Sequence, residues 1–174
     1  IKKSASDLIV EKAVELGARR IIPVRTQRSN APAVRTDRLE RIVIEATEQT
    51  ERMDIPEVGE ECSLAAFLDE WPEGRVLLFC DESGDDAAAP WGGNGGRALS
   101  MIDVFANLAK RPAAILIGPE GGFSPEERQL LREQAFVSPV SLGPRILRAE
   151  TAAIAAMAVW QAVCGDWADR APEN

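Results

Sequence analysis

Apolar side chains recur every three or four positions in several stretches of the chain, which is the spacing of one face of an α-helix. In the first stretch Ser4 or Ser6 can cap the N-terminal end of a helix, and Gly17 ends the helix, so both ends are marked. Ser124 and Pro125 mark another helix start, with two acids in the first turn. Helices are predicted at about 4–16, 36–53, 63–70, 98–109, from 125 onward and at 149–164.

Short apolar runs without helical spacing lie between these helices. The run RVLLFC at 75–80 is nearly continuous, as in a strand covered on both faces of its sheet. Similar runs occupy 113–117 and 137–142, and a shorter one at 20–24 contains Pro23, which favours an edge or a strand end. Because strands and helices alternate, the sequence predicts an α/β domain with a mainly parallel sheet flanked by helices.

Composition narrows the chemistry that this domain can perform. The 174 residues include no histidine, which excludes a Ser-His-Asp or Cys-His arrangement and any histidine ligand. Cys62, Cys80 and Cys164 are too far apart for a C-x-x-C motif, so no metal is expected. Their sparse, odd number suggests core thiols and a cytoplasmic location. The longest uncharged apolar run, 151–165, is shorter than the roughly 20 residues of a membrane span, so no membrane partner is expected.

The formal net charge of −8 is unevenly distributed along the chain. Residues 1–52 carry 11 basic and 8 acidic side chains, whereas residues 53–104 carry 2 basic and 12 acidic ones. The acidity is therefore concentrated in the middle third, which leaves a basic stripe in the first third that could meet phosphate. A solvated surface is the alternative interpretation of this stripe. Its members are Arg25, Arg28, Arg35, Arg38 and Arg41.

Two glycine-bearing loops follow predicted strands, at 118–122 and at 142–148. Ligands of open α/β sheets bind outside the carboxyl ends of the strands, where both loops are expected. Neither loop has the Gly-Lys-Ser/Thr of a Walker A motif or a G-x-G-x-x-G fingerprint after a strand. A conventional nucleotide pocket is therefore not expected, and two ordinary strand-to-helix turns are the structural alternative to a site.

The same loops carry a family resemblance. IGPEGGFSPEE at 117–127 and SLGPRILRAETA at 141–152 resemble the signature stretches of the 16S rRNA (uracil(1498)-N(3))-methyltransferase family. That family belongs to the trefoil-knotted SPOUT methyltransferases. LIVEKAVELGARRIIPVRTQRS at 8–29 and RLERIVIEATEQTERMDIPEV at 38–58 extend the match over most of the chain. The resemblance implies one SPOUT domain over 1–174 with a C-terminal deep trefoil knot, an exception to the rule that chains are not knotted.

Two features depart from the family pattern. Family members usually carry a PUA-like β-barrel before the methyltransferase domain, and this sequence shows no such barrel ahead of Ile1. The loop at 87–92 also looks longer than is typical. We therefore expect a catalytic domain without the N-terminal PUA-like RNA-binding domain.

The resemblance further implies S-adenosylmethionine as the cofactor, 16S rRNA of the small ribosomal subunit as the substrate, and a homodimer. Glycines would let the backbone approach the cofactor, and apolar side chains would cover its adenine. Core packing is an equal alternative for the three apolar residues of the second loop. The residues expected to bind the cofactor are Ile117, Gly118, Pro119, Glu120, Gly121, Gly122, Leu142, Gly143, Ile146, Leu147 and Arg148.

Methylation of uridine N3 requires an in-line attack and removal of the N3 proton. Without histidine the proton acceptor must be a carboxylate, a water molecule or the RNA. Arg145 or Arg148 could stabilise negative charge on the uracil oxygens, and Glu150 could orient that arginine or accept the proton. A helix-capping ion pair between Arg148 and Glu150 is the structural alternative. Glu120 fits a loop organiser better than a base.

The expected RNA contacts are Arg25, Arg28, Gln49 and Arg52. Glu45, Gln49 and Arg52 have the spacing of one helix face, which could line the RNA or cofactor cleft. A solvated helix face is the alternative. Two other functions stay open at this point: ribose 2′-O-methylation by another SPOUT enzyme, and non-catalytic RNA binding in ribosome assembly.

Overall fold

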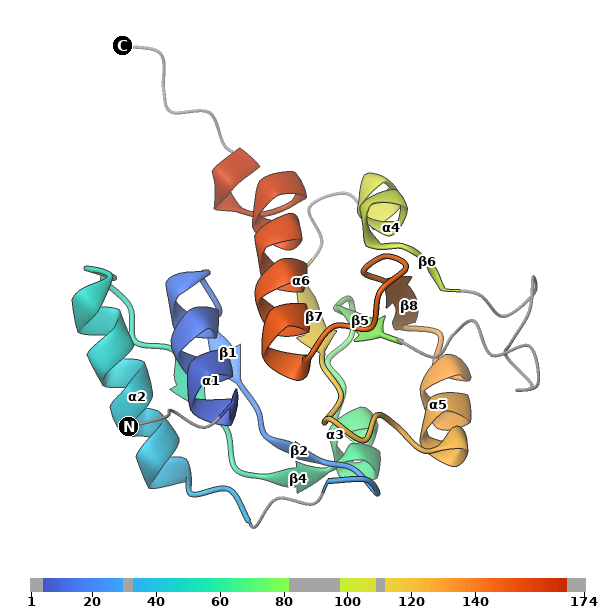
Figure 1. Cartoon of the computed structure of the whole chain (residues 1–174), viewed down its shortest axis with the longest axis horizontal. Helices are drawn as coiled ribbons and strands as arrows, with labels where there is room; N and C mark the ends of the chain where they lie inside the picture. The colour runs from blue at the N-terminus through green and yellow to red at the C-terminus, as the bar shows by residue number, and fades with distance from the viewer. Residues whose placement is uncertain (1–4, 30–32, 82–97, 109–111, 169–174) are drawn as a thin grey trace.

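The computed structural model describes residues 5–29, 33–81, 98–108 and 112–168 (Figure 1). The helices are α1 (Ala5–Glu15), α2 (Thr36–Gln49), α3 (Leu64–Asp69), α4 (Met101–Leu108), α5 (Pro125–Arg132), α6 (Ala149–Val163) and the short 3-10 helix η2 (Asp166–Ala168). The strands are β1 (Arg20–Ile21), β2 (Val24–Arg25), β3 (Glu57–Val58), β4 (Cys62–Ser63), β5 (Val76–Cys80), β6 (Leu99–Ser100), β7 (Ala113–Leu116) and β8 (Val137–Ser141). The loop at 87–92, which looks longer than is typical of the family, lies outside the described residues.

The largest sheet has the strand order β6-β8-β5-β7, and its neighbouring strands are all parallel. Figure 1 shows α4 and α6 on one side of β5 and α3 and α5 on the other. Because successive side chains of a strand point to opposite faces, β5 contributes to two separate cores. The α3/α5 core contains Leu64, Leu68, Leu77, Phe79, Leu116, Phe123 and Leu131. The α4/α6 core contains Val76, Leu78, Met101, Phe105, Val140 and Ala156. The prediction of a parallel α/β sheet covered on both faces is confirmed.

The N-terminal half adds α1 and α2, which pack on each other through an α1/α2 core of Val10, Val14, Leu39, Val43 and Ala46. Two short parallel strand pairs accompany them: β1 pairs with β3 beside α2, and β2 pairs with β4 beside α3. The prediction of one strand over 20–24 was therefore wrong. Strand pairing passes from β3 to β4 at Ile22-Pro23, because proline has no N–H to donate. The Pro23 carbonyl accepts from the Cys62 N–H at 3.1 Å.

The second helix ends earlier than its pattern suggested, at Gln49 rather than Met53. Glu51 has a φ of 55°, in the left-handed region, and the Arg52 N–H bonds back to the Thr47 carbonyl at 3.1 Å. The fourth helix likewise begins at Met101 rather than residue 98, because Leu99 and Ser100 pair with β8 as strand β6. In both places backbone hydrogen bonds set the helix boundary, and the apolar spacing of the sequence does not show them.

The thiols and acids of the described residues do not form a metal centre. Cys80 and Cys164 pack against the α4/α6 core, and Cys62 is half-buried beside Pro23. Burial raises the pKa of Cys80 to about 12, so its thiol stays protonated at neutral pH. Within the described ranges no three Cys, Asp or Glu side chains gather as metal ligands. Nor does any described helix combine the length and apolarity needed to cross a membrane.

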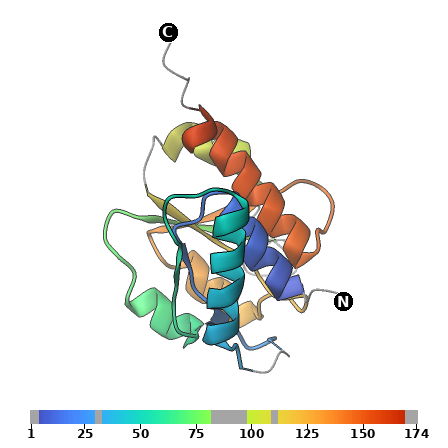
Figure 2. The ribbon, with the colours of Figure 1, turned by 90° about the vertical axis from the view of Figure 1, so that its left-hand side faces the viewer.

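Gln161 of α6 joins the two halves of the domain. Both views show α1 lying between α2 and α6 (Figures 1 and 2). The Gln161 Nε2 donates to the Leu16 carbonyl at 2.7 Å, just beyond the C-terminal end of α1. Its Oε1 accepts from the Asp166 N–H at 3.0 Å, at the start of η2. The buried Gln161 amide therefore bonds to backbone groups at the ends of two helices. Gln161 and Leu16 are 145 residues apart in the sequence.

We predict that Gln161→Leu lowers the free energy of unfolding by about 1–3 kcal/mol, because the half-buried Leu16 carbonyl and the Asp166 N–H both lose the buried amide that pairs with them. Denaturant unfolding followed by circular dichroism measures this change. Gln129→Leu, on the exposed face of α5, is the matched control, with an expected change within about 0.5 kcal/mol. Equal stability of the two variants would contradict the structural role of Gln161.

Candidate functional site

Two loops leave the same edge of the main sheet. The residues after β7 lead into the 118–122 loop, and the residues after β8 lead into the 142–148 loop. Because β7 and β8 both lie parallel to β5 and flank it, their carboxyl ends lie at one edge, as predicted. Ile117 and Leu142, at the bases of these loops, pack against the same α4/α6 core. The two stretches singled out in the sequence therefore start from a common place in the fold.

The first loop is held close to the sheet by Phe123. The Gly122 N–H bonds to the Pro119 carbonyl at 2.8 Å and closes a turn. A Cβ on Gly118 would lie 2.7 Å from the Phe123 ring, so only glycine allows this approach. The Phe123 ring in turn packs edge-on against Phe79, with 5.0 Å between centroids. The core of the domain thus fixes the loop, while Glu120 remains exposed.

Helix α5 begins with a capping box directly after this loop. The Ser124 Oγ accepts from the Glu127 N–H at 3.2 Å, and Glu127 Oε2 accepts from the Ser124 N–H at 2.9 Å. The predicted helix start is confirmed. Sequence reasoning did not single out Glu127, although Ser-x-x-Glu is the known signal for such a box. Its other oxygen, Oε1, accepts from the Gln27 N–H at 2.8 Å, and this contact has no local signal.

A buried ion-pair cluster anchors the other side of α5. Asp81 follows β5 and is 5% exposed, and Arg132 donates to its Oδ2 at 3.1 Å from Nε and 2.7 Å from Nη2. Arg128 also pairs with Asp81. Desolvation lowers the pKa of Arg128 to about 10, with smaller contributions from the charges of Arg132 and Arg28, so it still carries a charge at neutral pH. Sequence reasoning missed this cluster, because its members lie about 50 residues apart.

The second loop carries most of the exposed candidate residues. Ile146 is 82% exposed, Arg145 and Arg148 are exposed, and Leu147 and Glu150 are half-buried. Core packing therefore does not account for Ile146. Arg148 is the N-cap residue of α6 but makes no side-chain capping bond. Its carbonyl accepts from the Ala152 N–H at 2.8 Å.

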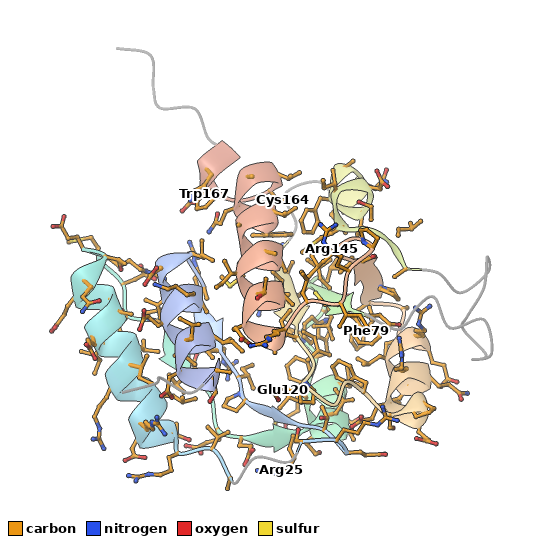
Figure 3. All side chains as sticks on the ribbon, in the orientation of Figure 1. Arg25, Phe79, Glu120, Arg145, Cys164 and Trp167 are labelled. Atoms are coloured by element: carbon orange, nitrogen blue, oxygen red, sulfur yellow. The ribbon has the colours of Figure 1, made fainter. Side chains whose placement is uncertain are left out.

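The candidate residues Glu120, Arg145 and Arg148 lie in different parts of the two loops. Figure 3 shows Arg145 beside α4 and Glu120 near α3, with Phe79 between them in the view. Arg148 stands instead at the N-terminal end of α6, where the helix dipole adds partial positive charge. Of the two arginines in this loop, Arg148 is therefore the one placed at a helix terminus, where an anionic group is favoured.

The predicted basic stripe is divided by ion pairs. Arg35 and Arg41 both pair with Asp37, and a hydrogen bond from Arg35 lowers the pKa of Asp37. Arg38 pairs with Asp7 of α1. These contacts favour the solvated-surface interpretation for this part of the stripe.

Arg25 and Arg28 take different positions within the stripe. The Arg25 Nη2 lies 2.7 Å from Glu61 Oε1. Arg28 reaches the first glycine loop, where its Nη1 donates to the Gly121 carbonyl at 3.2 Å. Of the predicted RNA contacts, Arg28 is the one that the structure brings to the glycine loop.

The predicted common face of Glu45, Gln49 and Arg52 is not formed, because α2 ends at Gln49. Arg52 turns back and its Nη1 donates to the carbonyls of Val14 at 2.7 Å and Ala18 at 2.9 Å. With its side chain 14% exposed, Arg52 caps the end of α1, which favours a structural role over RNA contact. Glu45 and Gln49 face a shallow depression of about 60 Å³ between α1 and α2. Its lining consists of Asp7, Glu11, Ile42, Glu45, Ala46 and Gln49.

Known proteins resemble this chain closely in sequence. Residues 1–161 match the family described as the RNA methyltransferase domain. Ribosomal RNA small subunit methyltransferase E of Rickettsia conorii is 33% identical over 158 residues, covering 91% of this chain and 59% of that protein. The protein of the same name from Aquifex aeolicus is 33% identical over 157 residues, covering 88% of this chain and 61% of that protein. The chain thus spans about three fifths of the relatives that it matches.

Solved structures agree with the sequence matches. Ribosomal RNA small subunit methyltransferase E of Neisseria gonorrhoeae, bound to S-adenosyl methionine, is 30% identical with a TM-score of 0.73, covering 95% of this chain and 64% of that one. A methyltransferase of Legionella pneumophila in complex with the same cofactor is 32% identical with a TM-score of 0.70, covering 92% and 62%.

A more distant likeness concerns the fold alone. The SpoU methyltransferase AviRb of Streptomyces viridochromogenes is 23% identical with a TM-score of 0.51, covering 91% of this chain and 56% of that one. The sequence match over 1–161 and the folds of these neighbours cover most of the chain, its parallel sheet included. The chain therefore belongs to the family of RNA methyltransferase domains.

Proposed function

We propose that this domain transfers a methyl group from S-adenosylmethionine to N3 of a uridine in 16S rRNA of the small ribosomal subunit. The observation that carries the proposal is the pair of signature loops, 117–127 and 141–152, folded from one edge of a parallel sheet. The relative from Neisseria gonorrhoeae, 30% identical over nearly the whole chain, is bound to this cofactor. Cofactor, substrate and activity all come to this chain by that likeness.

The residues of the two loops fit a cofactor with an adenine and a charged tail. Around Gly143 an added Cβ would meet no atom within 4 Å, so open space adjoins the second loop. Ile146 offers exposed apolar surface there, and Ile117 and Leu142 form apolar bases for both loops. Backbone groups of Pro119 to Gly122 and Gly143 to Leu147 are the expected polar partners. When bound, the cofactor supplies a methyl group that its sulfonium already activates.

Arg148 and Glu150 are the residues that we assign to the reaction. As uridine N3 gains the methyl group it loses its proton, and the developing negative charge spreads to the uracil oxygens. The Arg148 guanidinium and the N-terminal end of α6 together place positive charge where those oxygens would be stabilised. Glu150, half-buried in the first turn of the same helix, would orient Arg148 or accept the proton.

The proposal includes a knotted, dimeric domain that works in the cytoplasm. The knot rests on the signature resemblance and on the likeness of fold to a SpoU methyltransferase. A homodimer would cover large apolar side chains that are exposed in the single chain. Those near the main sheet are Leu99 of β6, Ile102 of α4 and Ile146 of the second loop.

Two measurements test this function. Calorimetry with S-adenosylmethionine is expected to show binding to the folded chain. Incubation with small ribosomal subunits that lack the modification, followed by nucleoside mass spectrometry, is expected to yield 3-methyluridine. A 2′-O-methylated nucleoside would instead indicate another SPOUT specificity, and RNA binding without cofactor affinity would indicate a non-catalytic binder.

We predict that Gly118→Ala weakens cofactor binding, because its Cβ would displace Phe123 and with it the first loop. Overpacking of this kind also costs about 1–3 kcal/mol of stability. Gly74→Ala is the matched control: Gly74 has a φ of 80° but open space around it, far from both loops in sequence. Calorimetry and denaturant unfolding of both variants separate lost stability from lost affinity. Equal cofactor affinity in the two variants would refute the role of the first loop.

We predict that Arg148→Ala lowers kcat for RNA methylation by about 100-fold or more, the usual effect of removing one donor to a developing oxyanion. The fold should survive, because Arg148 makes no side-chain capping bond. Single-turnover methylation with saturating cofactor measures the change. Arg75→Ala, an exposed arginine before β5, should leave kcat unchanged. Full activity in Arg148→Ala would remove it from the mechanism.

A further inference from the structure

The turn at 26–29 lies against the first glycine loop, although about 100 residues separate them in sequence. The turn is internally braced. The Thr26 N–H donates to Ser29 Oγ at 3.1 Å, the two hydroxyls lie 2.9 Å apart, and the Ser29 N–H bonds to the Thr26 carbonyl at 3.1 Å. This bracing holds the backbone of the turn, from which the Gln27 N–H and the Arg28 side chain project.

Two hydrogen bonds join the turn to the loop and to the helix that follows it. The Gln27 N–H donates to Glu127 Oε1 at 2.8 Å, and Arg28 Nη1 donates to the Gly121 carbonyl at 3.2 Å. The backbones also approach closely, since a Cβ on Gly121 would lie 3.2 Å from both the Cβ and the carbonyl oxygen of Arg28. The glycine at 121 therefore serves this contact as well as the loop.

Glu127 is the centre of this junction. It is 6% exposed, and both of its carboxylate oxygens are used, one by Gln27 and the other by Ser124. A capping box needs only one of them. The second oxygen fixes a turn from a distant part of the chain. A buried carboxylate is tolerated here because N–H donors satisfy both oxygens.

Arg28 brings positive charge to the rim of the glycine loop. It is exposed, and its charge is close enough to contribute to the lowered pKa of Glu126, after larger contributions from a backbone hydrogen bond and from Ser124. An exposed arginine at the edge of a ligand loop is suited to a phosphate of an RNA backbone. Its place there depends on a turn that Glu127 holds.

We propose that Glu127 is a positioning residue that holds Arg28 against the first glycine loop, and so couples RNA binding at the 26–29 turn to cofactor binding at 118–122. The inference rests on the proposed function. The Arg28 side chain is exposed, and its bond to the Gly121 carbonyl lets cofactor bound at the loop restrict its orientation, so RNA then binds a side chain with less conformational freedom to lose. Because such coupling is reciprocal, bound RNA tightens cofactor binding by the same factor.

The experiment measures four dissociation constants on the full chain: S-adenosylhomocysteine with and without RNA, and a 16S rRNA fragment with and without S-adenosylhomocysteine. The unaltered protein is expected to show a coupling factor of about 5-fold or more. Glu127→Gln keeps the size of the side chain but has only one acceptor oxygen for two N–H donors. Its coupling factor should fall to about 1, and its KM for RNA should rise with kcat at saturating RNA nearly unchanged.

Ser124→Ala is the matched control for stability. It removes the capping acceptor of the Glu127 N–H but leaves both carboxylate contacts, so it should be destabilised by about 1 kcal/mol with its coupling intact. Arg28→Ala, an exposed change that does not threaten the fold, should lose the coupling and weaken RNA binding. It should also reduce the salt dependence of RNA binding by about one phosphate contact.

The outcomes distinguish the positioning role of Glu127 from the proposed function on which it rests. Coupling that is lost in Glu127→Gln and in Arg28→Ala, but kept in Ser124→Ala, supports the positioning role. Unchanged coupling in Glu127→Gln and Arg28→Ala, or binding of both ligands to the unaltered protein without coupling, overturns the inference while the proposed function stands. Failure of the unaltered protein to bind S-adenosylhomocysteine overturns the proposed function itself.

Discussion

The burial of β5 on both faces is the constraint on which the rest of the domain depends. Its residues Leu77, Leu78 and Phe79 are fully buried, and alternate side chains enter the α3/α5 core and the α4/α6 core. A strand buried in this way needs helices on both sides, which parallel neighbours with helical crossovers supply. The same parallel arrangement sends the chain after β7 and after β8 to one edge of the sheet. The two glycine loops thus both begin there, as a consequence of how the core is covered.

A small number of buried polar side chains then fix the elements around this sheet. Gln161 ties α6 to the end of α1, Arg52 caps that same helix end, and Asp81 holds α5 through two arginines. Each satisfies backbone or charged groups that would otherwise be costly to bury. The candidate site consequently rests on rigid supports, whereas its exposed residues, Ile146 and Arg148 among them, face solvent.

The differences between expectation and structure have a common cause. The pattern around 20–24 is that of one strand, but Pro23 divides it because proline has no backbone N–H to donate to the neighbouring strand. The pattern up to Met53 is helical, but a left-handed residue at Glu51 ends α2 and frees Arg52 to reach Val14 and Ala18. In both places a backbone hydrogen-bond requirement outweighs apolar periodicity. The common face of Glu45, Gln49 and Arg52, which could line the RNA or cofactor cleft, is not formed for this reason.

The sequence by itself determined the helices α1 to α6, the strands β5, β7 and β8, the parallel α/β class and the two glycine loops, because apolar spacing, capping residues and glycine positions are local signals. The two-residue strands β3, β4 and β6 were not predicted. The sequence also marked the start of α5 by Ser124 and Pro125, although the second half of the capping box, Glu127, was recognised only in the structure. Only the tertiary structure decided that the second oxygen of Glu127 binds Gln27, that Arg28 reaches Gly121, and that Arg52 serves α1. These are contacts between polar groups distant in sequence. Each depends on which elements the buried sheet brings together, and nothing in the residues near either partner encodes it.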